Sequence, residues 1–141
     1  MPATPVQRLF ALLTALICLG LLVAAAWTTP DAHGHGTHTQ LGLPPCGFVL
    51  AFNKPCVTCG MTTAFAHAVR LDLASAARVQ PMGTLLALLT PLVFWACLHT
   101  AVFGSRLAHL LADLALRPRV LWTLFGVLLA SWGYTLAAWR G

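Results

Sequence analysis

Three long apolar stretches without charge constrain the fold of this chain more than any other feature of its sequence. They cover Leu9–Trp27, Gly83–Phe103 and Val120–Trp139, and none of them contains Asp, Glu, Lys or Arg. A helix of about 20 apolar residues crosses the hydrocarbon core of a bilayer, so each stretch is long enough to span a membrane. Only 8% of the 141 residues are charged, against roughly 25% in soluble domains. The sequence therefore predicts an all-α membrane protein, a single domain over residues 1–141 with three transmembrane helices.

The first apolar stretch also has the features of a secretory signal peptide. Arg8 precedes it and Ala24-Ala25-Ala26 lies near its end, which is the order of charged, apolar and small residues before a cleavage site. The stretch is longer than the usual apolar core of about 7–15 residues in signal peptides. We therefore favour a retained transmembrane helix.

The positive net charge of +5 comes from a shortage of acidic residues, with three Asp and Glu against eight Lys and Arg. No basic patch is interleaved with aromatic residues, so nucleic acid is not expected as a partner. The bilayer is the expected partner, because arginines at the ends of the apolar stretches can reach lipid headgroups. These are Arg8, Arg106, Arg117, Arg119 and Arg140. Positive residues in short loops favour the cytoplasmic side, which places the 104–119 loop inside and the 28–60 loop in the periplasm.

The segment between the first two apolar stretches divides into a Cys- and His-rich loop at 28–60 and an amphipathic helix at 61–80. Met61 and Phe65 begin an apolar i, i+4 pattern that predicts a helix lying at the membrane surface or re-entering it. Asp72 would fall on the apolar face of an unbroken helix. A break at 70–71 is therefore expected, with Asp72 capping a second short helix and Pro81 opening the next element. A short interfacial helix is also predicted at 105–115.

Three of the five cysteines form the pattern Cys46-x9-Cys56-x2-Cys59-Gly60. Two sulfurs separated by two residues can bind one tetrahedral ion, and Gly60 permits the tight turn between them and the helix. Cys46 and His38 would complete a Cys3His site for zinc or iron. The other two cysteines lie within apolar stretches and are expected to pack there; they are Cys18 and Cys97.

The same three thiols permit disulfide chemistry. Cys59 is expected at the N-terminus of a helix, where the macrodipole favours the thiolate. In an oxidising compartment Cys56 and Cys59 would pair, leaving Cys46 free or exchanging. A fold-stabilising role, thiol exchange and neither of these therefore remain open interpretations.

Two further patterns carry weaker expectations. His33, His35 and His38 with Asp31 could gather a transition metal, although the glycines among them make this segment mobile. In the third apolar stretch two small-xxx-small pairs let another helix approach closely, by packing within the chain or by association with a second copy or a membrane partner. These pairs are Gly126/Ala130 and Gly133/Ala137.

A family resemblance is visible in GTHTQLGLPPCGF and KPCVTCGMTTAFAHAVRLDLASAARVQP. These residues resemble small bacterial inner-membrane proteins of a domain-of-unknown-function family with the signature Cys-Pro-x-Cys-Gly-x-Thr-(Arg or Thr)-Ala, then Gly-Asp-Leu and Asn- or Gln-Pro. The resemblance covers about residues 36–81 and implies a bacterial inner-membrane protein. It maps onto Cys46, Cys56 and Cys59. It also maps onto positions expected to be structural, namely Gly60, Thr62, Asp72 and Pro81.

The chain departs from that signature at two positions. Val57 stands where Pro is usual and Leu71 stands where Gly precedes Asp. A weaker likeness connects CVTCGMTTAFA to the active-site helix of vitamin K epoxide reductases, which keeps a thiol oxidoreductase using Cys56 and Cys59 as an alternative.

No other pattern favours an enzyme, because the three acidic residues are scattered and neither a Ser/His/Asp order nor a phosphate-binding glycine loop is present. The sequence therefore predicts a non-enzymatic membrane protein with a cysteine-centred structural or metal-binding cap at the membrane surface. The alternatives are a thiol oxidoreductase and an interaction subunit with neither metal nor redox chemistry.

Overall fold

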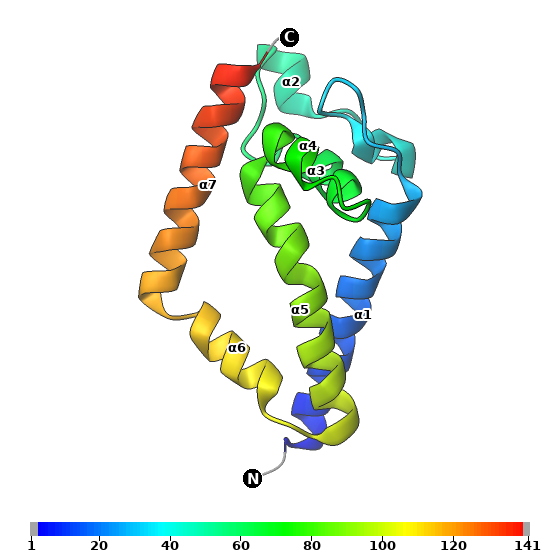
Figure 1. Cartoon of the computed structure of the whole chain (residues 1–141), viewed down its shortest axis with the longest axis vertical. Coiled ribbons are helices and arrows are strands. Elements are labelled where there is room, and N and C mark those ends of the chain that lie inside the picture. Colours follow the sequence, from blue (N-terminus) through cyan, green and yellow to red (C-terminus); the bar gives the residue numbers. More distant parts are fainter. Residues whose placement is uncertain (1–2, 140–141) are drawn as a thin grey trace.

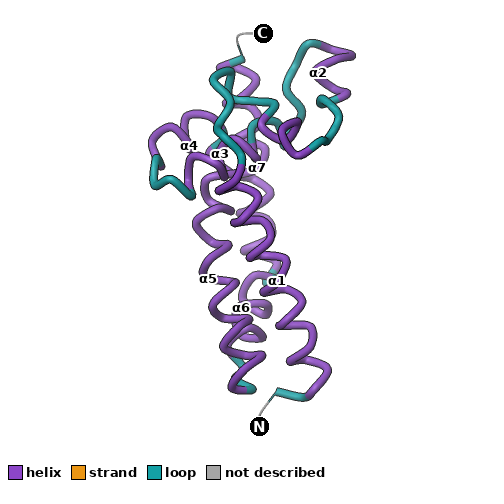
Figure 2. The backbone as a smooth tube through the Cα atoms, turned by 90° about the vertical axis from the view of Figure 1, so that its right-hand side faces the viewer, coloured by secondary structure: helices purple, strands orange, loops and turns teal. Residues whose placement is uncertain are grey.

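The computed structural model describes residues 3–139, and within them every regular element is a helix, which confirms the all-α class (Figures 1 and 2). The helices are α1 Pro5–Trp27, the 3-10 helix η1 Thr37–Leu41, α2 Gly47–Phe52, α3 Met61–Ala68, α4 Leu73–Val79, α5 Pro81–Phe103, α6 Leu107–Ala115 and α7 Pro118–Ala138. Three of them, α1, α5 and α7, are long and apolar enough to cross a membrane, with mean hydropathies of 2.7, 1.9 and 1.5. The chain is a membrane protein.

Each of the three long helices begins at a proline, a few residues before the apolar stretch that predicted it. Pro5, Pro81 and Pro118 occupy the first helical position, where the missing N–H would have no intrahelical partner and the fixed φ suits the helix. At α1 the start is reinforced by a capping box, in which the Thr4 and Gln7 side chains each accept from the other residue's backbone N–H.

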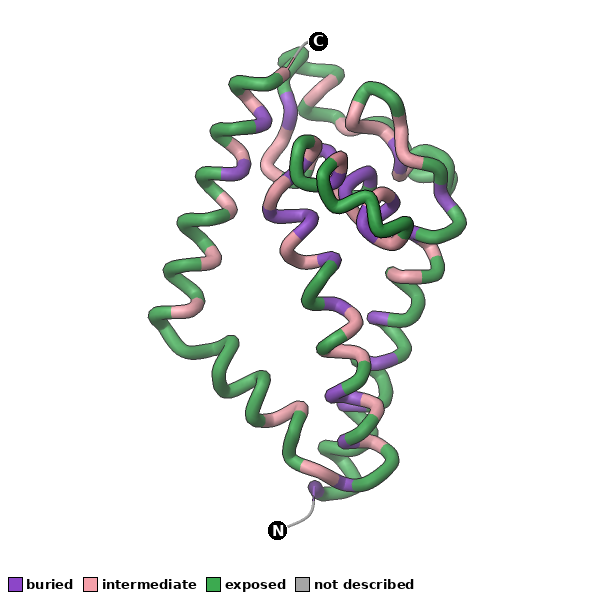
Figure 3. The backbone as a smooth tube through the Cα atoms, in the orientation of Figure 1, coloured by how far each residue is buried: buried purple, intermediate pink, exposed green. Residues whose placement is uncertain are grey.

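The helices α1 and α5 pack side by side along their length, whereas α7 diverges from them (Figure 1). Small residues fill the α1–α5 contact, including Ala11, Ala15 and Cys97, and Cys18 is also buried. The expected packing role of the two span cysteines agrees with this burial. Figure 3 shows buried residues along this contact and under α3 and α4, while α6 and most of α7 are exposed.

The amphipathic segment after the cysteines is two helices rather than one, as the position of Asp72 predicted. The chain turns at Leu71, which has a φ of +63°, and the Asp72 carboxylate accepts a hydrogen bond from the Ser75 N–H at the start of α4. The other Asp72 oxygen lies 3.2 Å from His67 Nδ1. Together α3 and α4 lie across the end of α5 (Figure 1).

Replacing Leu71 with glycine is expected to stabilise the protein by about 0.5–1 kcal/mol. A left-handed backbone costs an L-residue about 1–2 kcal/mol, which glycine avoids. Glycine in turn loses more conformational entropy on folding, which offsets about 0.5–1 kcal/mol of that gain. The Leu71 side chain is 85% exposed, so little packing is lost. The check is the apparent Tm in detergent, with Asn53→Gly as the control, because asparagine already tolerates the φ of +51° at that position. An unchanged or lowered Tm for Leu71→Gly would show that the side chain is held in the bilayer.

Two arginines donate hydrogen bonds to the carbonyls at the C-terminal ends of long helices. Arg8 donates from Nε and Nη2 to the carbonyls of Ala101 and Val102, each at 2.9 Å, at the C-terminal end of α5. Arg70 does the same at the C-terminal end of α1. The last carbonyls of a helix lack intrahelical partners and lie at the negative end of its dipole. A guanidinium there finds free acceptors and a favourable field. Arg8 remains exposed, so its contact with lipid headgroups stays a prediction beside these hydrogen bonds.

A fully buried glutamine connects α7 to the cysteine loop. Gln80 donates from Nε2 to the Val57 carbonyl at 3.1 Å and accepts from the Ser131 hydroxyl through Oε1. Ser131 in turn accepts from the Met82 N–H at 3.1 Å. A second tether runs from Trp132 Nε1 to the Pro55 carbonyl at 3.1 Å. The upper end of α7 is thus held by hydrogen bonds to the segment around the cysteines.

Candidate functional site

A cavity of about 650 Å³ lies where the ends of α1, α3 and α5 meet residues 28–60, which we call the cap segment. Helix α1 contributes Leu21 to the wall, and α5 contributes Leu86. From the cap segment and α3 come the predicted ligands and two of the predicted structural residues. These are His38, Cys46, Cys56, Cys59, Gly60 and Thr62. The structure therefore brings the sequence-predicted residues of the cysteine site to one wall.

Local turns determine how the thiols are presented. Cys46 is the N-cap residue of α2, and Cys56 and Cys59 lie in a turn closed by the Cys59 N–H donating to the Cys56 carbonyl at 3.0 Å. Gly60 follows with a φ of +84° and forms the N-cap of α3. A Cβ at Gly60 would lie 2.9 Å from the Gly34 carbonyl oxygen, so the glycine allows the histidine segment, residues 31–38, to pack against the cysteine turn.

All five cysteines are unpaired, and the hydrogen-bonded thiols are Cys46 and Cys56, whose sulfurs lie 3.5 Å apart. Cys56 Sγ is also 3.4 Å from the Thr58 hydroxyl. A disulfide needs about 2.05 Å between its sulfurs. The structure therefore places Cys56 in contact with Cys46, ten residues away, as well as with Cys59, its partner in the C-x-x-C spacing.

Hydrogen bonding and burial move the pKa values of two of the thiols in opposite directions. The pKa of Cys46 is lowered, chiefly by a backbone hydrogen bond from Val49 at the start of α2, with burial opposing it. The pKa of Cys59 is raised to about 11, chiefly by burial, and the neighbouring Cys56 and Cys46 add to the effect. The expectation that Cys59 is the thiolate is therefore wrong, because Gly60 rather than Cys59 caps α3 and desolvation of the sulfur dominates.

The metal site predicted from spacing is only partly assembled. His38 shares the cavity wall with the three cysteines, but its Nε2 lies 3.2 Å from the Pro44 carbonyl. Within residues 3–139 no group of three or more His, Cys, Asp or Glu side chains is arranged to hold one ion. His67 is absent from this wall and contacts Asp72 instead.

A second cavity of about 520 Å³ lies on the other side of Cys59, which lines both. Its wall includes His33, His35 and His67. His33 Nδ1 lies 3.2 Å from Asp31, and the His35 ring packs edge-on against Trp139 with centroids 4.5 Å apart. Burial lowers the pKa of His35. The histidine segment is thus docked on the protein by contacts that its glycine content did not suggest.

Several residues that build this region escaped sequence reasoning. Thr37 and Thr63 are fully buried and share a hydroxyl–hydroxyl hydrogen bond of 2.7 Å, and Thr37 also accepts from the Asp31 N–H. Nothing in the local pattern pairs two threonines 26 residues apart. Arg70 and Gln80 escaped for the same reason, although a polar Gln80 beside Pro81 between apolar helices is a signal for a buried partner.

The small residues of α7 do not pack within the chain. Among the described residues, nothing lies within 4 Å of where a Cβ on Gly126 or Gly133 would be. The favoured use of Gly126/Ala130 and Gly133/Ala137 in intramolecular packing is therefore wrong for these glycines. Association through this face with a second copy or a membrane partner stays a prediction.

The fold and the site define a small all-helical membrane protein with three spanning helices and a cysteine-lined cavity beneath a cap segment. The profile of the family described as "Protein of unknown function (DUF2752)" matches residues 46–96, which run from the first cavity cysteine into the middle of α5. This match confirms the resemblance to a domain-of-unknown-function family over about a third of the chain. No curated protein and no solved structure matches the chain.

Proposed function

We propose that this chain is a non-catalytic protein of the bacterial inner membrane, whose periplasmic cap segment is fixed over the helix ends by a Cys46–Cys56 cross-link. The observation that carries the proposal is the 3.5 Å between the two sulfurs, reached from opposite ends of the loop that contains α2. The elevated pKa of Cys59, about 11, supports a static thiol rather than a nucleophile that turns over.

A disulfide is the form of this cross-link that an oxidising periplasm favours. Cys46 and Cys56 lose two protons and two electrons to a protein disulfide, which is reduced to its dithiol as the new S–S bond forms. Closing the intervening loop removes unfolded-chain entropy worth about 3 kcal/mol. The cross-link therefore fixes α2 and the cap segment without any catalytic role.

A metal-held cap segment is the second candidate. Three thiols and His38 line the same cavity wall, and the sulfurs of a tetrahedral zinc site with Zn–S bonds of about 2.3 Å lie about 3.8 Å apart. The 3.5 Å between Cys46 and Cys56 is close to this edge length. The His38 ring could keep its Nε2–H on the Pro44 carbonyl and bind zinc or iron through Nδ1, while the cysteine ligands would have to lose their protons, including Cys59 with its raised pKa.

Thiol counting and elemental analysis on the same detergent-purified sample distinguish the two candidates. The disulfide predicts three free thiols before reduction and five after it, a linked peptide joining Cys46 to Cys56, and no stoichiometric metal. We expect Cys46→Ser and Cys56→Ser each to lower stability by about 3 kcal/mol, and the double variant to lower it no further.

Cys59→Ser is the matched control, because it removes a cavity thiol that the disulfide does not use. A drop as large as that of the other two variants, with one zinc or iron per chain in the parent, would establish the metal-held form. Five free thiols, no metal and an unchanged Tm in all three variants would rule out a cysteine-held cap segment.

A further inference from the structure

The cavity beneath the cap segment extends from the membrane surface into the depth of the bilayer. Along α1 its wall runs from Thr28 back to Leu21, which is seven residues or roughly 10 Å of helix. On α5 it reaches Thr90, nine residues from the start of the helix or roughly 13 Å. The lower part of the cavity therefore lies at the level of lipid chains, whereas its upper part lies among the residues of the cap segment.

The described residues that line the deep part of the cavity offer no free hydrogen-bonding group to a ligand. In the deep part, the Thr90 hydroxyl donates to the Leu86 carbonyl at 2.7 Å and is satisfied by its own helix. At the upper end of the α1 wall, the Thr28 hydroxyl donates to the Ala24 carbonyl at 3.1 Å. The polar groups that remain lie at the upper end, where His38 and Thr58 stand beside the thiols. Such a wall fits a molecule with a hydrocarbon body and a compact polar end.

Charge restricts the polar end further. No residue that lines the cavity, in the part of the chain the structure describes, is Asp, Glu, Lys or Arg. A phosphate or carboxylate in this cavity would lose its hydration without a cation to replace it, which costs several kcal/mol. Neutral hydroxyl or ester groups can instead bond to the His38 ring or the Thr58 hydroxyl.

The bilayer is the source of such a molecule, because the cavity wall is continuous with the lipid-facing surface. Leu21 lines the cavity from a membrane-spanning helix and is 51% exposed. The volume of about 650 Å³ lies within the range of small-molecule sites, about 300–1,000 Å³. We propose that this cavity binds one neutral single-chain lipid, with its chain between α1 and α5 and its uncharged head against the cap segment.

Native mass spectrometry of the detergent-released protein, titrated with 1-monooleoylglycerol, tests this site. We expect one saturable adduct per chain. Lysophosphatidylcholine with the same acyl chain should bind at least tenfold more weakly, because its head is charged. Farnesol in place of monooleoylglycerol reports whether an isoprenoid alcohol is the better occupant, since both share the neutral head.

Matched tryptophan variants locate the binding. Ala24→Trp fills the cavity from α1 and Leu86→Trp fills it from α5, and each should reduce occupancy at least tenfold. Ala26→Trp is the control, because Ala26 is exposed on the same helix and does not line the cavity. Circular dichroism and the apparent Tm establish whether each variant is folded. If one of the two cavity variants does not fold, the other is used for the test.

Adducts that do not saturate at one per chain, or that persist equally in a folded Ala24→Trp or Leu86→Trp variant, would overturn the proposal. So would equal binding of lysophosphatidylcholine. The site depends on the helices and not on the proposed cross-link, so the reduced protein and Cys46→Ser should bind as well. Five free thiols in the parent protein together with retained lipid binding would refute only the proposed disulfide.

Discussion

Gly60→Ala is expected to destabilise the protein by more than about 2 kcal/mol and to loosen the histidine segment, residues 31–38, from the cysteine turn. The φ of +84° alone costs an L-residue about 1–2 kcal/mol. The added Cβ would also lie 2.9 Å from the Gly34 carbonyl oxygen and 3.0 Å from Val79 Cγ1. Since the first of these atoms belongs to the backbone, relief requires a shift of the histidine segment rather than of one side chain. The measurement is the apparent Tm in detergent.

Gly126→Ala is the matched control for this substitution. The same atom is added in the interior of α7, where the described structure has nothing within 4 Å of it. Because alanine is favoured over glycine inside a helix by roughly 0.5–1 kcal/mol, this variant should be neutral or slightly more stable. A second readout is alkylation of Cys59, which should become faster in Gly60→Ala and stay unchanged in Gly126→Ala. Equal behaviour of the two variants would mean that the packing of the histidine segment does not depend on Gly60.

Local sequence signals were sufficient for the three spans, for the break between α3 and α4 and for α6, but not for η1 and α2, which lie where a loop was predicted. Uncharged apolar length identified the three spans, and the prolines at 5, 81 and 118 explain why the helices begin slightly before those stretches. Asp72 correctly indicated the break between α3 and α4, because an unpaired carboxylate is costly on an apolar helix face. Leu71 did not prevent that break even though the related signature has glycine there; the turn forms with a positive φ instead.

The sequence predicted which residues form the candidate site but not which of its thiols contact each other. Spacing grouped Cys46, Cys56 and Cys59 with His38, and these residues do share one cavity wall. Which thiols meet depends on how α2 folds back onto the turn, a contact across ten residues that no periodicity encodes. The burial that raises the pKa of Cys59 likewise depends on packing of the cap segment, so a helix-dipole argument from sequence gave the wrong direction.

The partners of the arginines could not be predicted from the sequence, because two different roles place an arginine at the end of an apolar segment. A guanidinium there can serve lipid headgroups or the unpaired carbonyls of a neighbouring helix. For Arg8 and Arg70 the structure shows the second of these roles. Their substitution therefore tests the packing of the fold.

Arg70→Met should be among the most damaging substitutions in the chain, with a loss of about 3 kcal/mol. The guanidinium donates four hydrogen bonds, three of them to the last carbonyls of α1 and its C-cap residue. The acceptors are Ala66 at 2.7 Å, Thr28 at 2.8 Å, Ala26 at 3.1 Å and Ala25 at 3.3 Å. Hydrogen bonds to charged groups contribute about 1.5–3 kcal/mol each when measured singly, and they are not additive. The cation also lies at the negative end of the α1 dipole.

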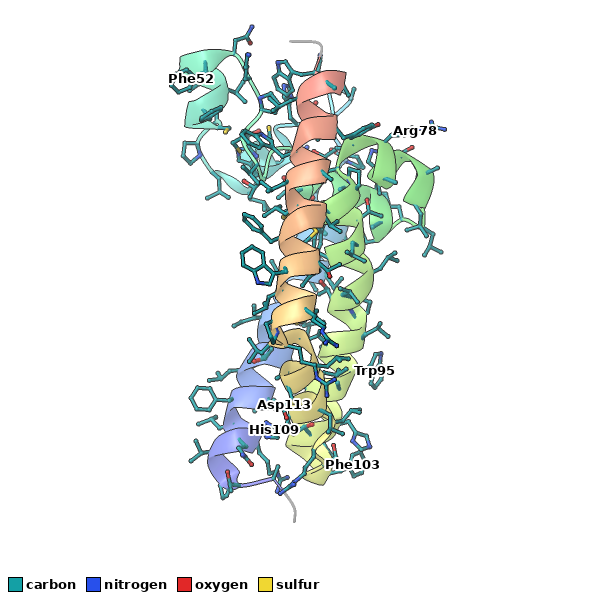
Figure 4. The ribbon with its side chains drawn as sticks, turned by 90° about the vertical axis from the view of Figure 1, so that its left-hand side faces the viewer. Phe52, Arg78, Trp95, Phe103, His109 and Asp113 are labelled. Carbon is teal, nitrogen blue, oxygen red and sulfur yellow. The ribbon has the colours of Figure 1, made fainter. Side chains whose placement is uncertain are left out.

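Methionine keeps the length and apolar stem of the side chain, so the variant removes the donors and the charge while leaving most of the packing. Arg70→Lys should recover only part of the loss, because one ammonium cannot reach the carbonyls of α1 and of α3 together. Arg78→Met is the control: it removes the same charge from α4, where the side chain is exposed, as that of Arg70 also is, but points outward (Figure 4) rather than toward the carbonyls at the end of α1. In detergent the apparent Tm should fall by roughly 6 °C or more for Arg70→Met and by less than about 2 °C for Arg78→Met. Equal shifts for the two would show that the effect belongs to surface charge, and the junction between α1 and α3 would then have to be held by apolar contacts alone.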